Sequence, residues 1–141
     1  MSPLVRRFLK TAIAFLIFGV GLGVFMLARR EIGGVWSTPW WISAHTHTIL
    51  VGFVMMMIMG VVLWMFPRPP RDDTHFDPRL AEAAYWCIAV GTGVRLSASW
   101  RGPLRRPWRC AGGGPGGVAQ ALGLVLFFYT MWTRIRGRPD G

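Results

Sequence analysis

Long apolar stretches bordered by basic residues limit the folds open to this chain more than any other feature. The stretch 11–28 contains no charged side chain, and arginine or lysine stands on both sides of it. A helical span over 8–28 would rise roughly 31 Å, which is enough to cross the hydrocarbon core of a bilayer. The sequence therefore predicts a helix that stays in the membrane, and its glycines Gly19, Gly21 and Gly23 predict only close packing between helices.

The rest of the chain has the same character, with 52% hydrophobic and only 16% charged residues among 141. Soluble domains usually contain roughly 25% charged residues. We predict an all-α integral membrane four-helix bundle that forms a single transmembrane domain over 1–141. Its expected spans are 8–28, 44–66, 80–99 and 118–132, and an earlier start of the last span, within the preceding glycine run, stays open.

Two connecting stretches differ from these spans in composition. The stretch 29–43 holds Trp36, Trp40 and Trp41 together with glycine and proline, so it is expected to be a loop or a short interfacial helix that lies flat at the level of the lipid headgroups. The stretch 100–117 combines arginine, proline and glycine without a hydrophobic period. It is either an irregular polar loop or the product of a reading-frame error, and the sequence leaves both interpretations open.

The net charge of +10 admits two kinds of anionic partner. Clustered basic residues bind the phosphates of nucleic acid, but here they flank apolar stretches, where the positive-inside rule and anionic lipids place them. We therefore expect a lipid bilayer, and no nucleic acid, as partner. The distribution of basic residues between the helix ends favours both termini in the cytoplasm, with the protein in a bacterial inner (plasma) membrane.

Two histidines, His45 and His47, lie at the start of the second predicted span, where an imidazole beside hydrocarbon needs a partner or a ligand. Residues two apart on a helix point about 200° away from each other. Both can therefore face one metal only if the helix begins after them. Without a ligand, they would hydrogen-bond to water and lipid headgroups at the membrane boundary.

An imidazole held on a rigid helix suits the axial position of a haem iron, and the macrocycle needs apolar walls. Gly52 lies seven residues beyond His45, close to two helical turns, so its missing side chain leaves room for a flat ring on the same face. Phe53, Met56 and Met59 are candidate walls of this site. The candidate metal ligands are His45 and His47.

The run HTHTILVGFVMMMIMGVVLWMFPR, from His45 to Arg68, resembles the second transmembrane helix of the catalytic subunit of haem-copper oxidases and nitric oxide reductases, C-type oxidases in particular. That helix opens with a His-Thr pair and closes with a basic residue. The resemblance implies that His45 is an axial ligand of a haem b, with Thr46 and Phe53 also matching in kind. It further implies a role in electron transport in a respiratory chain.

The same resemblance sets a limit on function. The family's low-spin haem takes a second histidine from a late helix, and its copper and high-spin haem ligands also have no counterpart in this sequence. We therefore expect no reduction of oxygen or nitric oxide by this chain alone, but a role in electron transfer or in binding a gas such as nitric oxide. His75 is predicted at the opposite membrane face, about 30 Å from His45, too far to bind the same iron.

The sixth position of the iron has four candidate occupants: His47 from an unwound helix start, a histidine of a second copy, a methionine, or a gas in an open position. Symmetric self-association into a homo-oligomer is therefore one expectation. Arg95, near the end of the third predicted span, is predicted to lie close to the level of His45 in the membrane. There it would pair either with a haem propionate or with a lipid phosphate.

Two other classes of function stay open. A cofactor-free accessory or assembly subunit would pack against a respiratory oxidase or nitric oxide reductase complex through glycine-lined helix faces. A copper-handling protein would use the thioethers of Met55, Met56, Met57 and Met59, although consecutive methionines point around a helix and suit apolar filling. No acid-base pair, activated nucleophile or phosphate loop is recognisable in the sequence, so an independent enzyme is not expected.

Overall fold

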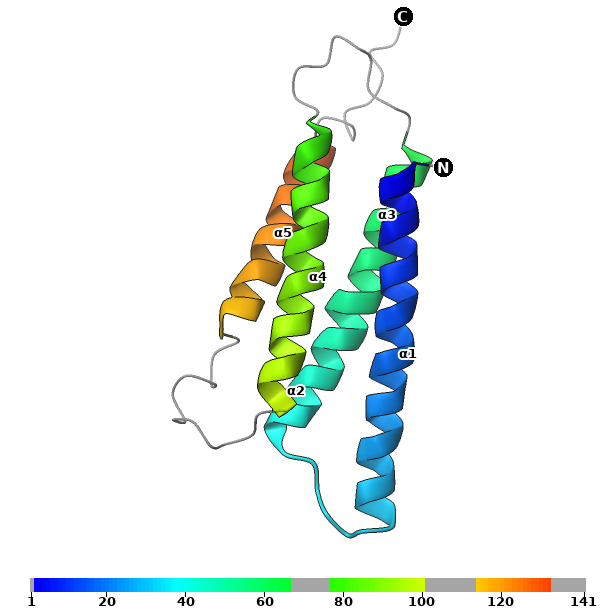
Figure 1. Cartoon of the computed structure of the whole chain (residues 1–141), viewed down its shortest axis with the longest axis vertical. Coiled ribbons are helices and arrows are strands. Elements are labelled where there is room, and N and C mark those ends of the chain that lie inside the picture. The colour runs from blue at the N-terminus through cyan, green and yellow to red at the C-terminus, as the bar shows by residue number, and fades with distance from the viewer. Residues whose placement is uncertain (1, 67–76, 101–113, 133–141) are drawn as a thin grey trace, which may run out of the picture.

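The computed structural model describes residues 2–66, 77–100 and 114–132, and every regular element within these ranges is a helix. The helices form four rods (Figure 1). The first is α1 (Pro3–Glu31), and the second is a composite rod of α2 (Pro39–His47), the π-helix η1 (Thr48–Met55) and α3 (Met56–Met65). The third is α4 (Pro78–Trp100), and the fourth is α5 (Gly114–Trp132). The predicted all-α four-helix architecture is confirmed.

α1 begins where the sequence supplies the signals for a helix start. Ser2 is extended, and its Oγ accepts a hydrogen bond from the amide of Val5 at 3.3 Å. Pro3 occupies the first helical position, where no amide hydrogen is needed. The helix continues to Glu31, beyond the predicted span, and Gly34, with a φ of +61°, then turns the chain.

The composite rod starts earlier than predicted. Its helix begins at Pro39 and runs to Met65 as one stretch of 27 residues. Trp40 and Trp41 lie in its first turn, so the connection predicted over 29–43 is shorter, 32–38, and its two ends belong to α1 and to the composite rod. Extended backbone at Phe66, the residue before a proline, ends the rod as the predicted span required.

The third and fourth rods also extend beyond their predicted spans. α4 continues to Trp100, and α5 already begins at Gly114, inside the glycine run. The glycine end of the stretch assigned to a polar loop is therefore helical, because glycine here allows close contact with α4, as shown below. The remainder of that stretch, and also Arg68 and His75, lie outside the described residues.

Three rods are long and apolar enough to cross a membrane: α1, the composite rod and α5. α4 is not among them; it carries Glu82 near its start and Arg95 near its end. Its assignment as a fourth span remains a prediction. The start of α1 and the end of α5 lie at the same end of the molecule (Figure 1).

The rods pack as two pairs, α1 with the composite rod and α4 with α5. A hydrophobic core joins the pairs near the start of α1. There Phe8 contacts Tyr85 of α4 edge-on, with ring centroids 5.1 Å apart, and its centroid lies 6.5 Å from that of Phe127 of α5. The other buried members of this core are Ala12, Met56, Met59, Ala84, Ile88 and Met131.

Polar contacts accompany the core at this junction. The hydroxyl groups of Thr11 and Tyr85 lie 2.9 Å apart, and Arg7 Nη1 lies 2.8 Å from Oε1 of Glu82. Both contacts join α1 to α4. The hydrophobic core and these polar contacts thus hold the two helix pairs together at the end of the molecule where α1 begins.

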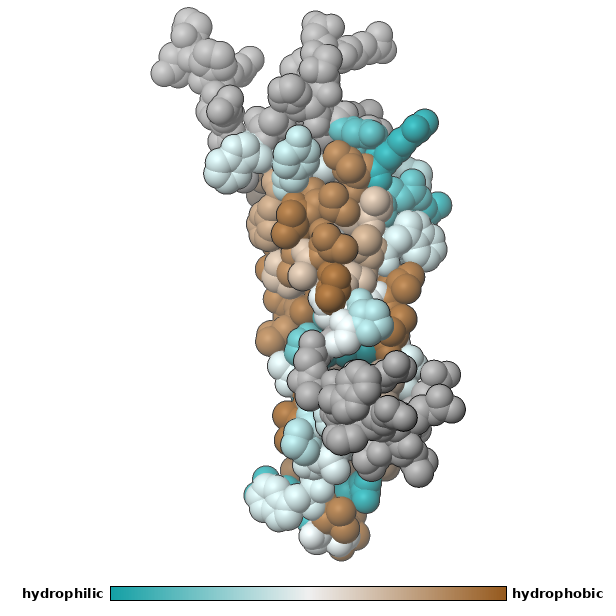
Figure 2. All heavy atoms as spheres, turned by 90° about the vertical axis from the view of Figure 1, so that its left-hand side faces the viewer, coloured by the Kyte–Doolittle hydropathy of each residue, from teal (hydrophilic) through white to brown (hydrophobic). Residues whose placement is uncertain are grey.

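The outward faces of the rods are apolar. Exposed aliphatic and aromatic side chains on α1 and α5 include Ile13, Ile17, Val20, Val24, Leu27, Val118, Leu122, Val125 and Phe128. Figure 2 shows one side of the molecule, where hydrophobic residues gather in a brown area and hydrophilic residues lie mainly away from it. Water would solvate such faces poorly, whereas lipid tails solvate them well. The chain is an integral membrane protein.

Candidate functional site

His45 lies in α2 with its imidazole turned toward α1. Its Nδ1 atom is 2.9 Å from the backbone carbonyl oxygen of Gly19, and the residue is half-buried. A carbonyl oxygen can only accept a hydrogen bond, so Nδ1 carries the hydrogen and donates it. In the neutral ring this leaves the lone pair on Nε2, which is then the nitrogen able to bind a metal.

A gap in the surface of α1 receives this imidazole. A Cβ atom built on Gly23 would lie 2.9 Å from Cε1 of His45 and 3.6 Å from Nε2, so a side chain at position 23 would collide with the ring. Gly19 and Gly23 stand about one helical turn apart, and we call these two residues the glycine socket. The sequence predicted only general packing for them; their four-residue spacing was the signal that could have singled them out. Gly21, between them, has nothing within 4 Å of its Cβ position.

His47 has a different environment. Its Nδ1 atom lies 2.9 Å from the carbonyl oxygen of Ser43, one turn earlier in the same helix. Because α2 is helical from Pro39 onward, the two histidines lie on different sides of it, as their spacing predicted. α2 therefore does not have the unwound start that would let His47 bind the same iron as His45.

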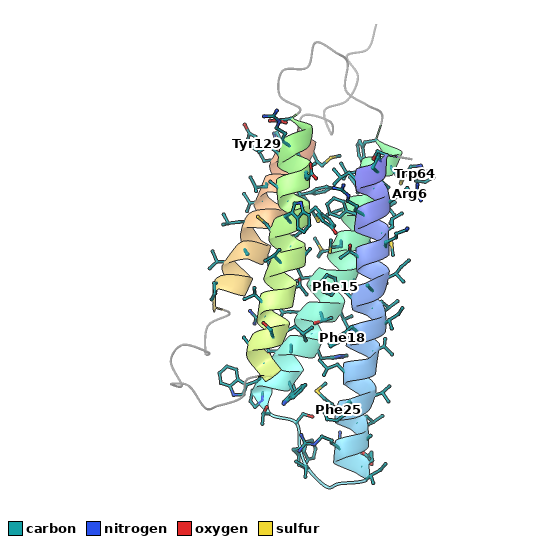
Figure 3. All side chains as sticks on the ribbon, viewed as in Figure 1. Arg6, Phe15, Phe18, Phe25, Trp64 and Tyr129 are labelled. Carbon is teal, nitrogen blue, oxygen red and sulfur yellow. The ribbon has the colours of Figure 1, made fainter. Side chains whose placement is uncertain are left out.

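The predicted walls of the haem site have packing partners of their own. Gly52 faces α1, as His45 does, but a Cβ atom at position 52 would lie 2.9 Å from Cγ of Phe15. Phe15 reaches from α1 toward the composite rod (Figure 3). Met56 is fully buried in the hydrophobic core, and Phe53 is partly buried against that core. The ring of Phe15 thus occupies the space beside Gly52 that the sequence had left for a flat cofactor.

Arg95 lies close to the level of His45. Its Nη2 atom donates a hydrogen bond to Oγ of Ser43 at 2.9 Å, and its Nη1 atom lies 3.0 Å from the Cβ position of Gly117, in the first turn of α5. Ser43 therefore contacts two of the candidate residues of this region, His47 through its carbonyl oxygen and Arg95 through its hydroxyl group. Nothing in the sequence pattern singles out Ser43.

The donor groups determine which cofactors fit this part of the chain. Within residues 2–66, 77–100 and 114–132, no three histidine, cysteine or acidic side chains gather into a group that could hold a metal ion. A haem iron is held in its plane by the macrocycle, so it needs only axial ligands from the protein. His45, with Nδ1 fixed and Nε2 available, fits that requirement, whereas a haem placed beside Gly52 would have to displace Phe15.

The sequence matches the family described as Cytochrome C and Quinol oxidase polypeptide I over residues 2–133. The chain belongs to this family. The resemblance noted in the second span is thereby confirmed, and it extends along nearly the whole chain. No solved structure gives a significant match.

The chain is also similar to the Cbb3-type cytochrome c oxidase subunit CcoN1 of Stutzerimonas stutzeri, to which it is 22% identical over 102 residues. The aligned region is 70% of this chain and 21% of the relative. The chain thus spans about a fifth of the length of the oxidase subunit that it matches. Membership in the family identifies its origin as oxidase-like.

Proposed function

We propose that this chain is a membrane haem b-binding protein in which Nε2 of His45 is an axial ligand of the iron. The observation that carries the proposal is the hydrogen bond from Nδ1 of His45 to the carbonyl oxygen of Gly19. Histidines that bind metals almost always donate their second ring N–H to such a group, which fixes the tautomer and the ring orientation. Haem and copper are the cofactors of this family, which adds support.

A haem bound here would supply an iron that carries one electron or binds a diatomic gas. The residues of the chain supply attachment and charge. His45 contributes one axial nitrogen from a rigid helix. Arg95 contributes a positively charged guanidinium group at the same level, which would attract a carboxylate such as a haem propionate. The hydrogen bond to Ser43 keeps that guanidinium group beside α2.

The second axial position distinguishes two versions of this function. If a histidine of a second copy fills it across a symmetry axis, the iron has two protein ligands and suits electron transfer. If it is open, the iron binds a gas such as nitric oxide. Family membership favours an association with the subunits of a respiratory complex in a bacterial inner membrane, and we include these subunits as partners in the proposal.

A cofactor-free accessory or assembly subunit is the second candidate function. It is favoured by the packing at Gly52, where Phe15 already fills the gap between α1 and the composite rod. Packing of this kind holds membrane helices together without a cofactor. The exposed apolar faces of α1 and α5 would then contact a larger complex as well as lipid.

Visible spectra of the protein purified in mild detergent, oxidised and then reduced with dithionite, separate the two candidates. We expect a b-type spectrum in the wild type and in His47→Ala, and its loss in His45→Ala. His47→Ala is the matched control because it removes an imidazole from the same helix. A spectral shift on adding carbon monoxide or nitric oxide to the reduced protein identifies an open sixth position. A folded but colourless wild type overturns the haem proposal and leaves the accessory subunit.

A further inference from the structure

We infer that the glycine socket, Gly19 and Gly23, positions His45 by fixing its tautomer and by holding its ring against the backbone of α1. The inference rests on the proposed function for what binds at Nε2, but the orientation of the ring is a property of the chain itself. Both glycines act through His45 and are therefore positioning residues.

Because Gly23 has no side chain, it leaves exposed the carbonyl oxygen of Gly19, which accepts the hydrogen bond from His45. A side chain on a helix leans toward the helix N-terminus and covers the turn before its own Cα atom. A side chain at position 23 would therefore cover the turn that contains the carbonyl group of Gly19. With glycine there, the second lone pair of that carbonyl oxygen, beyond the one used within the helix, is open to Nδ1–H of His45 at 2.9 Å.

Gly19 has a separate role in the packing of α1 against η1. A Cβ atom at position 19 would lie 2.5 Å from Cδ1 of Ile49 and 3.4 Å from Cγ2 of Thr48, both in η1. Its missing side chain thus lets the composite rod approach α1 in the turn that follows His45. A substitution at Gly19 would strike the side chains of Ile49 and Thr48, whereas one at Gly23 strikes the His45 ring, so Gly23 is the cleaner position at which to test the socket.

The decisive comparison is between Gly23→Ala and Gly21→Ala. Both add one methyl group to the same helix, but position 21 has nothing within 4 Å, whereas position 23 meets the His45 ring at 2.9 Å. The infrared spectrum of protein labelled in its histidine rings distinguishes the two tautomers, and the signal lost in His45→Ala is that of His45. We expect the Nδ1–H tautomer in the wild type and in Gly21→Ala, and its loss in Gly23→Ala. Haem affinity should fall about 10- to 100-fold in Gly23→Ala alone.

A further variant keeps the test decisive if Gly23→Ala fails to fold. The double variant Gly23→Ala/His45→Ala removes the ring that the new methyl group would strike, so it should fold as His45→Ala does. If the double variant fails to fold while His45→Ala folds, Gly23 serves another contact and the inference is overturned.

The outcomes separate this inference from the proposed function. A colourless wild type that has the Nδ1–H tautomer, lost only in Gly23→Ala, supports the socket and refutes haem binding. A pigmented wild type whose Gly23→Ala variant keeps both the tautomer and the haem affinity supports haem binding and overturns the socket. Equal effects of Gly21→Ala and Gly23→Ala would also overturn it.

Discussion

The two helix pairs of this molecule use glycine in different ways. Between α4 and α5, glycines bring backbones together: a Cβ atom on Gly91 would lie 2.8 Å from the carbonyl oxygen of Gly116, and one on Gly116 would lie 2.7 Å from that of Gly91. Between α1 and the composite rod, glycines face side chains instead. Phe15 lies beside Gly52, and the ring of His45 lies beside Gly23.

The difference separates a fixed contact from an adaptable one. A backbone neighbour cannot move unless its whole helix moves, whereas a side chain can change its rotamer. The α4–α5 contact is therefore rigid. A buried hydrogen bond from Gln120 to Thr92, at 2.9 Å, also joins these two helices. The α1 pair instead offers gaps that side chains fill, and one of those side chains, His45, has a ring nitrogen available for chemistry.

The largest effect is expected from Gly91→Ala, because the added methyl group meets the backbone of α5. Over-packing of this kind costs about 1–3 kcal/mol, and we expect a net loss of about 2 kcal/mol in the free energy of unfolding, measured by titration with sodium dodecyl sulfate. Gly93→Ala is the matched control in the same helix, because nothing lies within 4 Å of its Cβ position. It should be neutral or stabilising by up to about 1 kcal/mol. Equal losses in the two variants would contradict the rigid contact.

Gly52→Ala should have a smaller effect, because its nearest neighbour is the side chain of Phe15. A ring can shift where a backbone cannot, so we expect a loss of about 1 kcal/mol in the same titration. Combining it with Phe15→Leu should make the added effect of Gly52→Ala smaller than it is in the wild-type background. If Phe15→Leu leaves that effect unchanged, the contact between α1 and η1 is not the one described.

The hydrogen bond between Gln120 and Thr92 should contribute less again. Interhelical hydrogen bonds in membrane proteins are worth about 0.6 kcal/mol on average. A double-mutant cycle with Gln120→Leu and Thr92→Val, read by the same unfolding titration, should give a coupling energy near that value. A coupling energy of zero would mean that the α4–α5 pair is held by its glycine contacts alone.

The smallest effect is expected at the ion pair between Arg7 and Glu82, which joins the two pairs. Both side chains are about half exposed, at 53% and 49%, so water and salt screen their attraction. A cycle with Arg7→Ala and Glu82→Ala should give about 0.5 kcal/mol or less, decreasing as salt is added. A larger coupling energy that salt does not change would indicate that lipid or protein shields the pair.

The sequence alone predicted those features that depend on local composition. The apolar stretches identified the rods, the proline after Phe66 identified the end of the composite rod, and the position of His45 at a membrane boundary identified it as a candidate ligand. The composite rod begins at Pro39, five residues before the predicted span, because the tryptophans near Pro39 are typical of an interfacial segment as well as of a membrane helix. Thr38 and Pro39 form an ordinary helix start, which was the stronger signal.

The features that were missed depend on which helix faces meet. Gly52 does share a face with His45, but only the position of α1 shows that Phe15 fills the space beside it. The sequence left open a start of the fourth span within the glycine run; the structure begins α5 at Gly114, where Gly116 packs against the backbone of α4. The π-helix η1 is likewise set by hydrogen-bond register, which composition does not reveal.

The most direct test of the central claim, that Nε2 of His45 binds a haem iron, is chemical rescue of His45→Gly with imidazole. We expect a colourless variant whose reduced-minus-oxidised spectrum becomes b-type when imidazole is added, while His47→Gly keeps its haem without imidazole. Free imidazole would then replace the missing axial ligand. A His45→Gly protein that holds as much haem as the wild type without imidazole, with the same spectrum, would contradict the claim.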